Sequence, residues 1–233
     1  NADGSIATTI GGTTGLIRGS DLTLTTQVEN ALDGSITVAT EVTGSTIIAT
    51  TGDAADNNFG QNDDITIANS SAIDTTLVAN AYGEGADVTV TQTNGGLTVQ
   101  SISTENGAIS VTGVDADLTI DEVTAGGTND VTLATQNSGN IGLGAVTAGD
   151  DSVIINTVGD VFDHGAGVNV TAATLNIQAA RNVGTSVDDI TTAIDTLTAA
   201  GVTGALNVTD EDALAIGALS VADDINIAAA GVL

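Results

Sequence analysis

Short apolar segments recur along most of the chain at intervals of about 22 residues, which is a period typical of solenoid proteins. Six apolar-x-apolar triplets begin at Ile65, Val88, Ile109, Val131, Val153 and Leu175. The residue numbers of successive starts differ by 23, 21, 22, 22 and 22, and a weaker triplet follows at Leu197, again with a difference of 22. A repeat at one fixed period indicates a solenoid, in which each repeat forms one turn of a coil.

Two further apolar series follow the same period. A second series begins at Leu97, Leu118 and Ile141, whose residue numbers differ by 21 and 23. A third apolar position follows three residues after a second-series residue in the segments Val99–Ile102, Ile120–Val123, Leu143–Val146 and Ile216–Leu219. Gly, Asn and Asp, which favour turns, separate the segments. Each rung therefore carries three short apolar segments.

Apolar and polar residues alternate within these segments, as in Val88-Thr-Val-Thr and Ile109-Ser-Val-Thr. A period of two is typical of a strand with one buried face. The sequence therefore predicts an all-β fold, a right-handed parallel β-solenoid (β-helix) with three short strands per rung of about 22 residues. Dividing 233 residues by this period gives roughly ten rungs, and hence a rod on the order of 50 Å long.

We expect a single β-solenoid over residues 1–233, with less regular rungs in 1–64 and regular rungs in 65–233. The acidic, amide-rich stretch 53–64 is predicted to form a loop that protrudes from a rung.

Residues 183–200 allow two interpretations. The spacing of their apolar residues, with a capping-box pattern at Ser186 and Asp189, suits a short helix, whereas Leu197 keeps the register of the first series and favours a strand and a loop.

The composition fits a narrow core of constant cross-section. Aromatic residues make up only 1% of the chain, so the interior must be filled by Val, Ile, Leu and Ala. Proline is absent, and therefore no backbone donor is missing from a strand ladder. The chain has no cysteine, which excludes disulfides and thiolate metal sites. The residues at the two ends lead us to expect a processed form or a segment of a longer protein.

The charge excludes several classes of partner. The chain has thirty acidic residues but only two arginines and no lysine, which gives a net charge of −28. Nucleic-acid binding requires basic side chains that displace phosphate counterions, so we expect no nucleic-acid partner. Docking on anionic lipid is disfavoured for the same reason. No stretch approaches the roughly 20 apolar residues of a membrane span, so we expect no membrane insertion.

Acidic residues precede the first strand of several rungs, and equivalent positions of a solenoid stack on one another. These candidate metal ligands are Asp64, Asp87, Asp130, Asp151 and Asp224. Carboxylates about 4.8 Å apart repel by roughly 3 kcal/mol at an effective dielectric near 20, and bound Ca²⁺ would relieve that repulsion. Ala108 and Thr174 interrupt the series. The alternative is that aspartate only suits turns and solubility, in which case no cofactor is required.

Residues suited to catalysis are scarce, and we expect no enzyme. Parallel β-helices can carry a pair of acidic residues for glycoside cleavage. However, one Tyr and two Phe cannot form an aromatic shelf for sugars, and the basic side chains are limited to Arg18, Arg181 and His164. We interpret His164 as a loop residue and expect Arg181 to pair with nearby carboxylates.

Glycosylation motifs begin at Asn69, Asn169 and Asn207. Chance alone yields a few such motifs in a sequence this rich in Asn, Ser and Thr.

The rungs resemble the β-helical repeats of filamentous-haemagglutinin-like and other giant bacterial surface proteins. The resemblance lies in the segments Asn129–Leu133, Leu143–Gly149 and Leu175–Ala180, and it covers roughly residues 85–230. It implies an extracellular or cell-surface location and a right-handed β-helix.

Two functions fit this resemblance. The first is a structural or adhesive rod or stalk segment of a secreted cell-surface protein. The second is a self-assembling subunit of an extracellular filament or sheath, bridged by calcium. The expected partners are further copies of the chain, other surface proteins or glycans.

Overall fold

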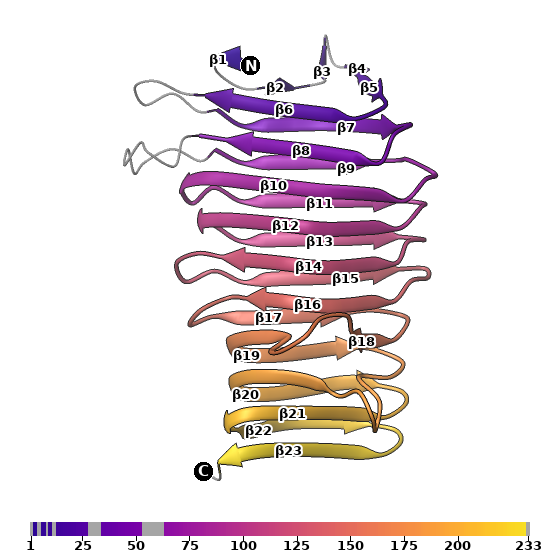
Figure 1. Cartoon of the computed structure of the whole chain (residues 1–233), viewed down its shortest axis with the longest axis vertical. Helices are drawn as coiled ribbons and strands as arrows, with labels where there is room; N and C mark the ends of the chain where they lie inside the picture. The colour runs from indigo at the N-terminus through magenta and orange to yellow at the C-terminus, as the bar shows by residue number, and fades with distance from the viewer. Residues whose placement is uncertain are drawn as a thin grey trace.

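The structure, a computed structural model, describes residues 2–3, 6–7, 9–10, 13–27, 34–52 and 63–231. Within these ranges the chain forms β-strands and turns, and no helix. Parallel strands stack into a β-solenoid of about nine turns, with about 22 residues per rung. Figure 1 shows the rungs stacked along the long axis, with β6 and β23 toward opposite ends. The predicted all-β solenoid is therefore confirmed.

Most rungs place one strand in each of two columns. The first column contains β7 (Ile36–Val42), β9 (Ile65–Asn69), β11 (Val88–Thr93), β13 (Ile109–Val114), β15 (Val131–Gln136) and β17 (Ser152–Asn156). The second column contains β6 (Leu22–Gln27), β8 (Thr46–Thr51), β10 (Thr75–Glu84), β12 (Leu97–Asn106), β14 (Leu118–Ala125), β16 (Ile141–Thr147) and β18 (Val161–Asp163).

The strands at both ends of the stack depart from this scheme. Toward the C-terminus, long strands pair with strands of both columns, since β19 pairs with β16 and β17, and β20 with β21 and β22. These strands are β19 (Val170–Ala179), β20 (Ile190–Val202), β21 (Leu206–Ala213), β22 (Ala215–Val221) and β23 (Ile225–Gly231). The N-terminal strands are β1 (Ala2–Asp3), β2 (Ile6–Ala7), β3 (Thr9–Ile10), β4 (Thr13–Thr14) and β5 (Leu16–Gly19). Of these five, β3 and β4 pair antiparallel with each other.

The second and third apolar segments of a rung join into one bent strand. In β14 the buried positions are Leu118, Ile120, Val123 and Ala125, and the two consecutive residues Asp121 and Glu122 both face solvent. Two exposed residues in succession interrupt the alternation and turn the strand around a corner. In β12 the corresponding corner is marked by a register shift against β10. The hydrogen-bonded ladder continues through the corner, so three apolar segments form two strands.

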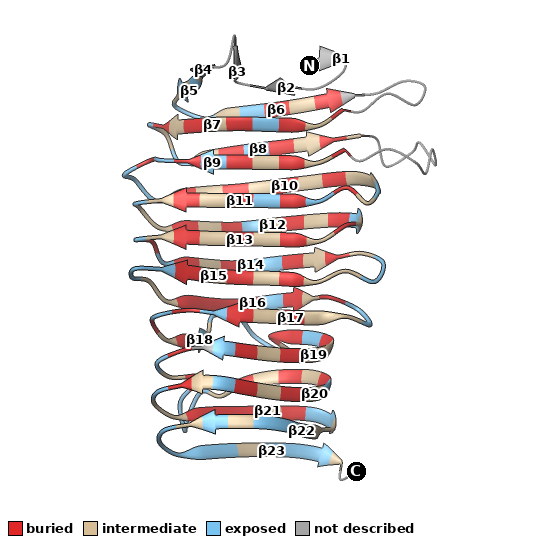
Figure 2. Ribbon diagram, turned by 180° about the vertical axis from the view of Figure 1, so that it is seen from behind, coloured by how far each residue is buried: buried red, intermediate tan, exposed pale blue. Residues whose placement is uncertain are grey.

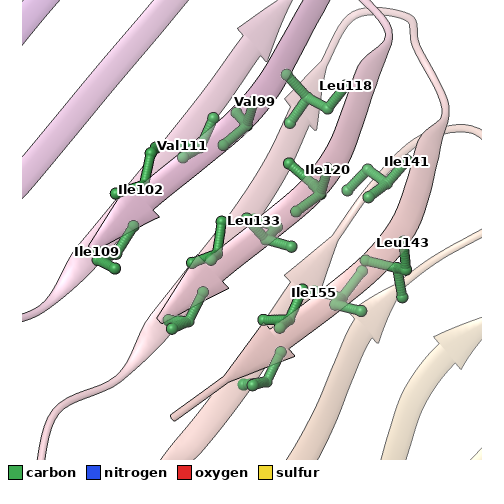
Figure 3. Close-up of a cluster of buried hydrophobic side chains, with 14 of the residues drawn as sticks. Val99, Ile102, Ile109, Val111, Leu118, Ile120, Leu133, Ile141, Leu143 and Ile155 are labelled. Atoms are coloured by element: carbon green, nitrogen blue, oxygen red, sulfur yellow. The ribbon is translucent and has the colours of Figure 1, made fainter. Parts of the chain in front are cut away.

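The core consists of aliphatic side chains stacked in register from rung to rung. The predicted first series is aligned directly, because Val88 pairs with Ile109, and each later member pairs with the next as far as Leu197. Figure 3 shows this packing around Leu118, Ile120 and Leu133. Along most strands in Figure 2, buried positions alternate with intermediate or exposed ones. The predicted match of Ile216–Leu219 to Val99–Ile102 is wrong, since Ile216 stacks on Leu197 and continues the first series.

The first rungs are longer than the later ones, which explains the lower number of turns. Ile36 pairs with Ile65 and Ile47 pairs with Leu77, so the residue numbers of stacked partners differ by 29 and 30 there. About nine turns spaced by about 4.8 Å give a rod of roughly 43 Å. The predicted loop at 53–64 lies outside the described residues except for Asp63 and Asp64. Residues 184–189 form a turn before β20, so the strand-and-loop interpretation of 183–200 is confirmed.

Candidate functional site

Three of the five predicted metal ligands lie in one column at the corner before the first-column strands. Here each carboxylate accepts a hydrogen bond from a backbone N–H of the next rung. Asp64 accepts from Asp87 at 2.9 Å, Asp87 from Ala108 at 2.8 Å, and Asp130 from Ser152 at 3.1 Å. We call Asp64, Asp87 and Asp130 the first Asx column. A charged acceptor forms a strong hydrogen bond to such a backbone donor, which gives these residues a structural role.

The other two predicted ligands lie elsewhere. Ser152, rather than Asp151, occupies the stacked position above Asp130, because Val131 pairs with Val153. Asp224 precedes β23, which stacks on β21, so it lies at the corner before the second-column strands. The five aspartates therefore do not form one ladder. Among the described residues, no group of three or more His, Cys, Asp or Glu side chains is arranged to hold a metal ion.

Asp151 nevertheless lies close to the first Asx column. A hydrogen bond with the Asp130 carboxyl raises the pKa of Asp151, and desolvation and repulsion from the Asp130 charge act in the same direction. The backbone N–H of Ser152 opposes this shift. The Asp151 carboxyl therefore keeps its proton to a higher pH than an isolated aspartate does.

A second set of acceptors, missed by the sequence analysis, lies at the corner before the second-column strands. Each of its side chains accepts from the backbone N–H of the equivalent residue one rung later, at 2.7–3.1 Å. We call this set the second Asx column, and it consists of Asp74, Asp117, Asn140, Asp160 and Asn182. The Asp or Asn directly before Leu118, Ile141, Val161 and Val183 was a usable sequence signal.

Arg181 reinforces the second Asx column. Its guanidinium binds both carboxylate oxygens of Asp160, with Nε donating to Oδ1 at 2.8 Å and Nη2 donating to Oδ2. The Arg181 hydrogen bond is the main reason that the pKa of Asp160 lies below its ordinary value, although burial opposes it. The expected pairing of Arg181 with a nearby carboxylate is therefore present.

His164 lies in the connection between β18 and β19. Its Nε2 is 3.2 Å from Asp121 Oδ1, and both side chains are about half exposed. Its backbone N–H donates to the Leu143 carbonyl at 2.8 Å. These contacts hold the β18–β19 connection against β14 and β16 of the two preceding rungs.

The asparagines of the three glycosylation motifs are buried. Asn69, Asn169 and Asn207 are 2%, 1% and 4% exposed. Each side-chain amide donates inside the fold: Asn69 to Gln92, Asn169 to the Leu143 carbonyl and Asn207 to the Val183 carbonyl. In the folded chain these side chains are therefore not accessible to a glycosylating enzyme.

Residues 184–189 project over the outer face of the C-terminal rungs. Val183 stacks on Leu206 and Ile190 on Val208, so that six residues lie opposite the single residue Asn207. We call this segment the 184–189 loop. It buries Asn207, whose Nδ2 donates to the Val183 and Gly184 carbonyls. The side chain of Val187 is 93% exposed on the loop.

An open groove of about 480 Å³ lies beside the 184–189 loop. We call it the lateral groove. Its lining residues come from the second Asx column, β18, the loop and the last two rungs: Asn140, Asp160, Val161, Phe162, Asn182, Gly184, Thr185, Ser186, Ala205, Asn207, Asp224 and Asn226. A second hollow of about 560 Å³ adjoins it and shares Thr185, Ser186, Asn207 and Asn226.

Phe162 is the aromatic residue of the lateral groove. It pairs with Gly142 of the preceding rung, and its ring lies so close that a Cβ on Gly142 would be 2.8 Å from ring carbons. Glycine is therefore required at position 142 for this packing. The Phe162 residue remains 39% exposed and lines the groove.

Comparisons with known proteins gave no match to a protein-family model, to a curated protein or to a solved structure. The structure supports the β-solenoid fold, whereas the resemblance to filamentous-haemagglutinin-like repeats rests on the sequence segments alone. In the described ranges, no helix is long and apolar enough to cross a bilayer.

Proposed function

We propose that this chain is a rod segment of a secreted cell-surface protein, which presents adhesive surfaces along its sides. The observation that carries this proposal is the continuous parallel stack of about nine turns around one aliphatic core. Each rung contacts mainly its neighbours, so such an architecture extends in one direction and holds its two ends apart.

The hydrogen bonds at the corners support a stiff rod. At the corners before the first-column and second-column strands the strand ladder is interrupted, and there the two Asx columns supply acceptors for backbone N–H groups of the next rung. None of the buried side-chain nitrogen and oxygen atoms of the described residues lacks a hydrogen-bond partner. A fully paired polar network strengthens the packing of adjacent rungs.

The extracellular location is part of the same proposal. It is supported by the resemblance of residues 85–230 to repeats of secreted surface proteins, and by the net charge of −28, which keeps exposed rods soluble. A structural role is preferred over catalysis because many polar side chains, including those of Asp160 and Arg181, form hydrogen bonds between rungs.

A self-assembling filament is the second candidate. In the last described rungs, Ile216 is 49% and Ile225 is 47% exposed. A further rung stacked there, from a continuation of the chain or from a second copy, would cover these side chains and pair with the free backbone groups of the edge. The charge of −28 opposes contact between copies unless cations are bound.

Negative-stain electron microscopy of the purified chain, in millimolar calcium and again in chelator, tests both candidates. The rod proposal predicts single particles of roughly 43 Å in both conditions. Long uniform filaments would support the assembly candidate instead, and filaments confined to the calcium sample would make calcium the bridging ion. Compact particles without an elongated axis would refute both.

The location is tested on cells that produce the parent protein. An antibody raised against the rod should label intact cells or the culture medium, and external protease should remove the signal. Labelling that appears only after the cells are opened would overturn the extracellular proposal while leaving the rod intact.

A further inference from the structure

The lateral groove runs along the rod axis rather than along the strands. One wall is formed by equivalent positions of five successive rungs, namely Asn140, Asp160, Asn182, Ala205 and Asp224. Four steps of about 4.8 Å make this wall about 19 Å long. Four of these five residues are polar, and Ala205 interrupts the series. Polar side chains therefore recur along most of this wall at the rung spacing, which is close to the length of one sugar ring in an extended chain.

Other residues that line the groove add hydroxyl groups, an amide and an aromatic ring. They include Thr185 and Ser186 of the 184–189 loop, Phe162 and Asn226. An amide or hydroxyl group can both donate and accept, as sugar hydroxyls do. The Phe162 ring rests on the Gly142 backbone and offers its exposed part to the groove. One ring is too small for a shelf that holds several sugars, but it is large enough to stack on a single sugar ring. An apolar surface with a few fixed polar groups is typical of small-molecule sites.

Several of the groove's polar groups are held in place before any ligand arrives. Asn182 Nδ2 donates to Asp160 Oδ1 at 2.9 Å, while Asn182 Oδ1 accepts from the Ala205 N–H at 3.1 Å. Asn226 Nδ2 donates to Asn207 Oδ1 at 2.9 Å. Preorganised side chains lose little conformational freedom on binding, which improves affinity.

The charge of the wall selects among ligands. Arg181 neutralises Asp160, but Asp224 and the net charge of −28 leave the surroundings negative. An acidic polymer would be repelled from this surface. A neutral ligand avoids that repulsion.

We infer that the lateral groove binds a neutral linear oligosaccharide, with Phe162 as the stacking platform and Asn140, Asp160 and Asn182 of the second Asx column in the hydrogen-bonding wall. The inference rests on the proposed adhesive role and names the ligand class of one adhesive surface. The sugar chain lies parallel to the rod axis, so that successive rings meet successive rungs.

Isothermal titration calorimetry with neutral tetrasaccharides of glucose, mannose, galactose and N-acetylglucosamine tests the inference, with tetragalacturonate as the acidic comparison. We expect at least one neutral ligand to bind with Kd about 1 mM or tighter, and tetragalacturonate not to bind. Phe162→Ala should weaken the binding by about tenfold or more, because it removes the stacking surface. Ser186→Tyr should abolish binding by filling the groove without disturbing the core, since Ser186 is exposed.

Ile73→Ala is the matched control, because Ile73 is also exposed, at 41%, but lies several rungs away. It should bind as the unaltered chain does. The inference is overturned if no neutral tetrasaccharide binds, if Ser186→Tyr binds normally, or if tetragalacturonate binds better than every neutral ligand. Should Phe162→Ala fail to fold, Ser186→Tyr decides alone. Electron microscopy of each variant separates the two proposals, since rods without sugar binding refute only the groove.

Discussion

At the scale of single residues, aspartate and asparagine serve this solenoid chiefly as acceptors for backbone donors. Asp117 Oδ1 accepts from the Asn140 N–H at 2.7 Å, and Asn140 Oδ1 in turn accepts from the Asp160 N–H at 2.9 Å. A backbone donor that loses its acceptor at such a corner loses about the net contribution of one hydrogen bond to a charged group. Turn-forming residues thereby also align neighbouring rungs.

Removing one of these acceptors should destabilise the rod locally. We expect Asp117→Ala to lower the free energy of unfolding by about 1 kcal/mol, because the Asn140 N–H loses its acceptor. Asp117→Asn keeps an oxygen at the same place and should change stability by less than about 0.5 kcal/mol. Urea unfolding followed by circular dichroism measures both. Glu122→Ala, at an exposed position of β14, is the control; an equal loss there would show that the charge, not the acceptor, matters.

The pair Asp130 and Asp151 makes stability depend on pH in a defined direction. The pKa of Asp151 is raised, so the folded chain retains its proton to a higher pH than the unfolded chain does. The stability from this proton is fully present below the unfolded pKa and is lost as pH rises through the folded pKa. At neutral pH the pair therefore retains its repulsion.

Asp130→Asn should relieve that repulsion while keeping the acceptor for the Ser152 N–H. We expect this variant to be more stable than the unaltered chain near pH 7, and the difference to shrink as the pH falls through the raised pKa of Asp151 and that carboxyl takes up its proton. Urea midpoints across this range measure the effect. Asp117→Asn is the control, since its oxygen faces Asn140 instead of a carboxylate. A gain that is independent of pH would contradict the explanation.

At the scale of strands and loops, the repeat period was sufficient to locate the core. Val88, Leu118 and Ile102 each belong to a series that stacks in register, as the spacing indicated. The corner inside the long strands was not predictable, because exposed pairs such as Asp121 and Glu122 look like a turn in the sequence. The ladder through that corner depends on pairing with the adjacent rungs.

Register also explains where the predicted metal ligands were misplaced. Spacings that vary from rung to rung fix a column only to within about one residue, and a shift of one residue moves a side chain to another environment. Asp151 is one residue out of register with Asp130, and Asp224 belongs to the other corner. The lateral groove could not be predicted from the sequence. It depends on the 184–189 loop, which exists because Val183 and Ile190 stack on Leu206 and Val208, two residues that lie only two positions apart.

The 184–189 loop should be removable without loss of the fold. One residue suffices to bridge Val183 and Ile190, since only Asn207 lies between their partners. We expect deletion of 185–189, which leaves Gly184, to give a continuous strand, a rod of unchanged length and a Tm within a few degrees of the original. Circular dichroism and electron microscopy measure these properties. The same deletion should abolish sugar binding, and collapse of the rod would show that the loop supports the rungs.

At the scale of the whole molecule, a charge of −28 is distributed over about nine turns. Stacking brings equivalent side chains of successive rungs within about 5 Å, so repulsion between them opposes folding along the whole rod. The aliphatic core and the backbone ladders outweigh this repulsion. Dissolved salt reduces it, because the screening length falls from about 30 Å at 0.01 M to about 8 Å at 0.15 M.

Salt should therefore stabilise the rod, and the comparison of two divalent ions tests whether calcium has a site of its own. We expect Tm to rise with NaCl and to rise equally with Ca²⁺ and Mg²⁺ at matched concentration, because general screening does not distinguish them. A built site would distinguish them, since calcium accepts more oxygen ligands in flexible geometry than magnesium does. Differential scanning calorimetry measures the three series. A calcium-specific rise that Asp130→Asn removes would instead assign a calcium site to Asp130 and Asp151, and would favour the calcium-bridged filament over the solitary rod.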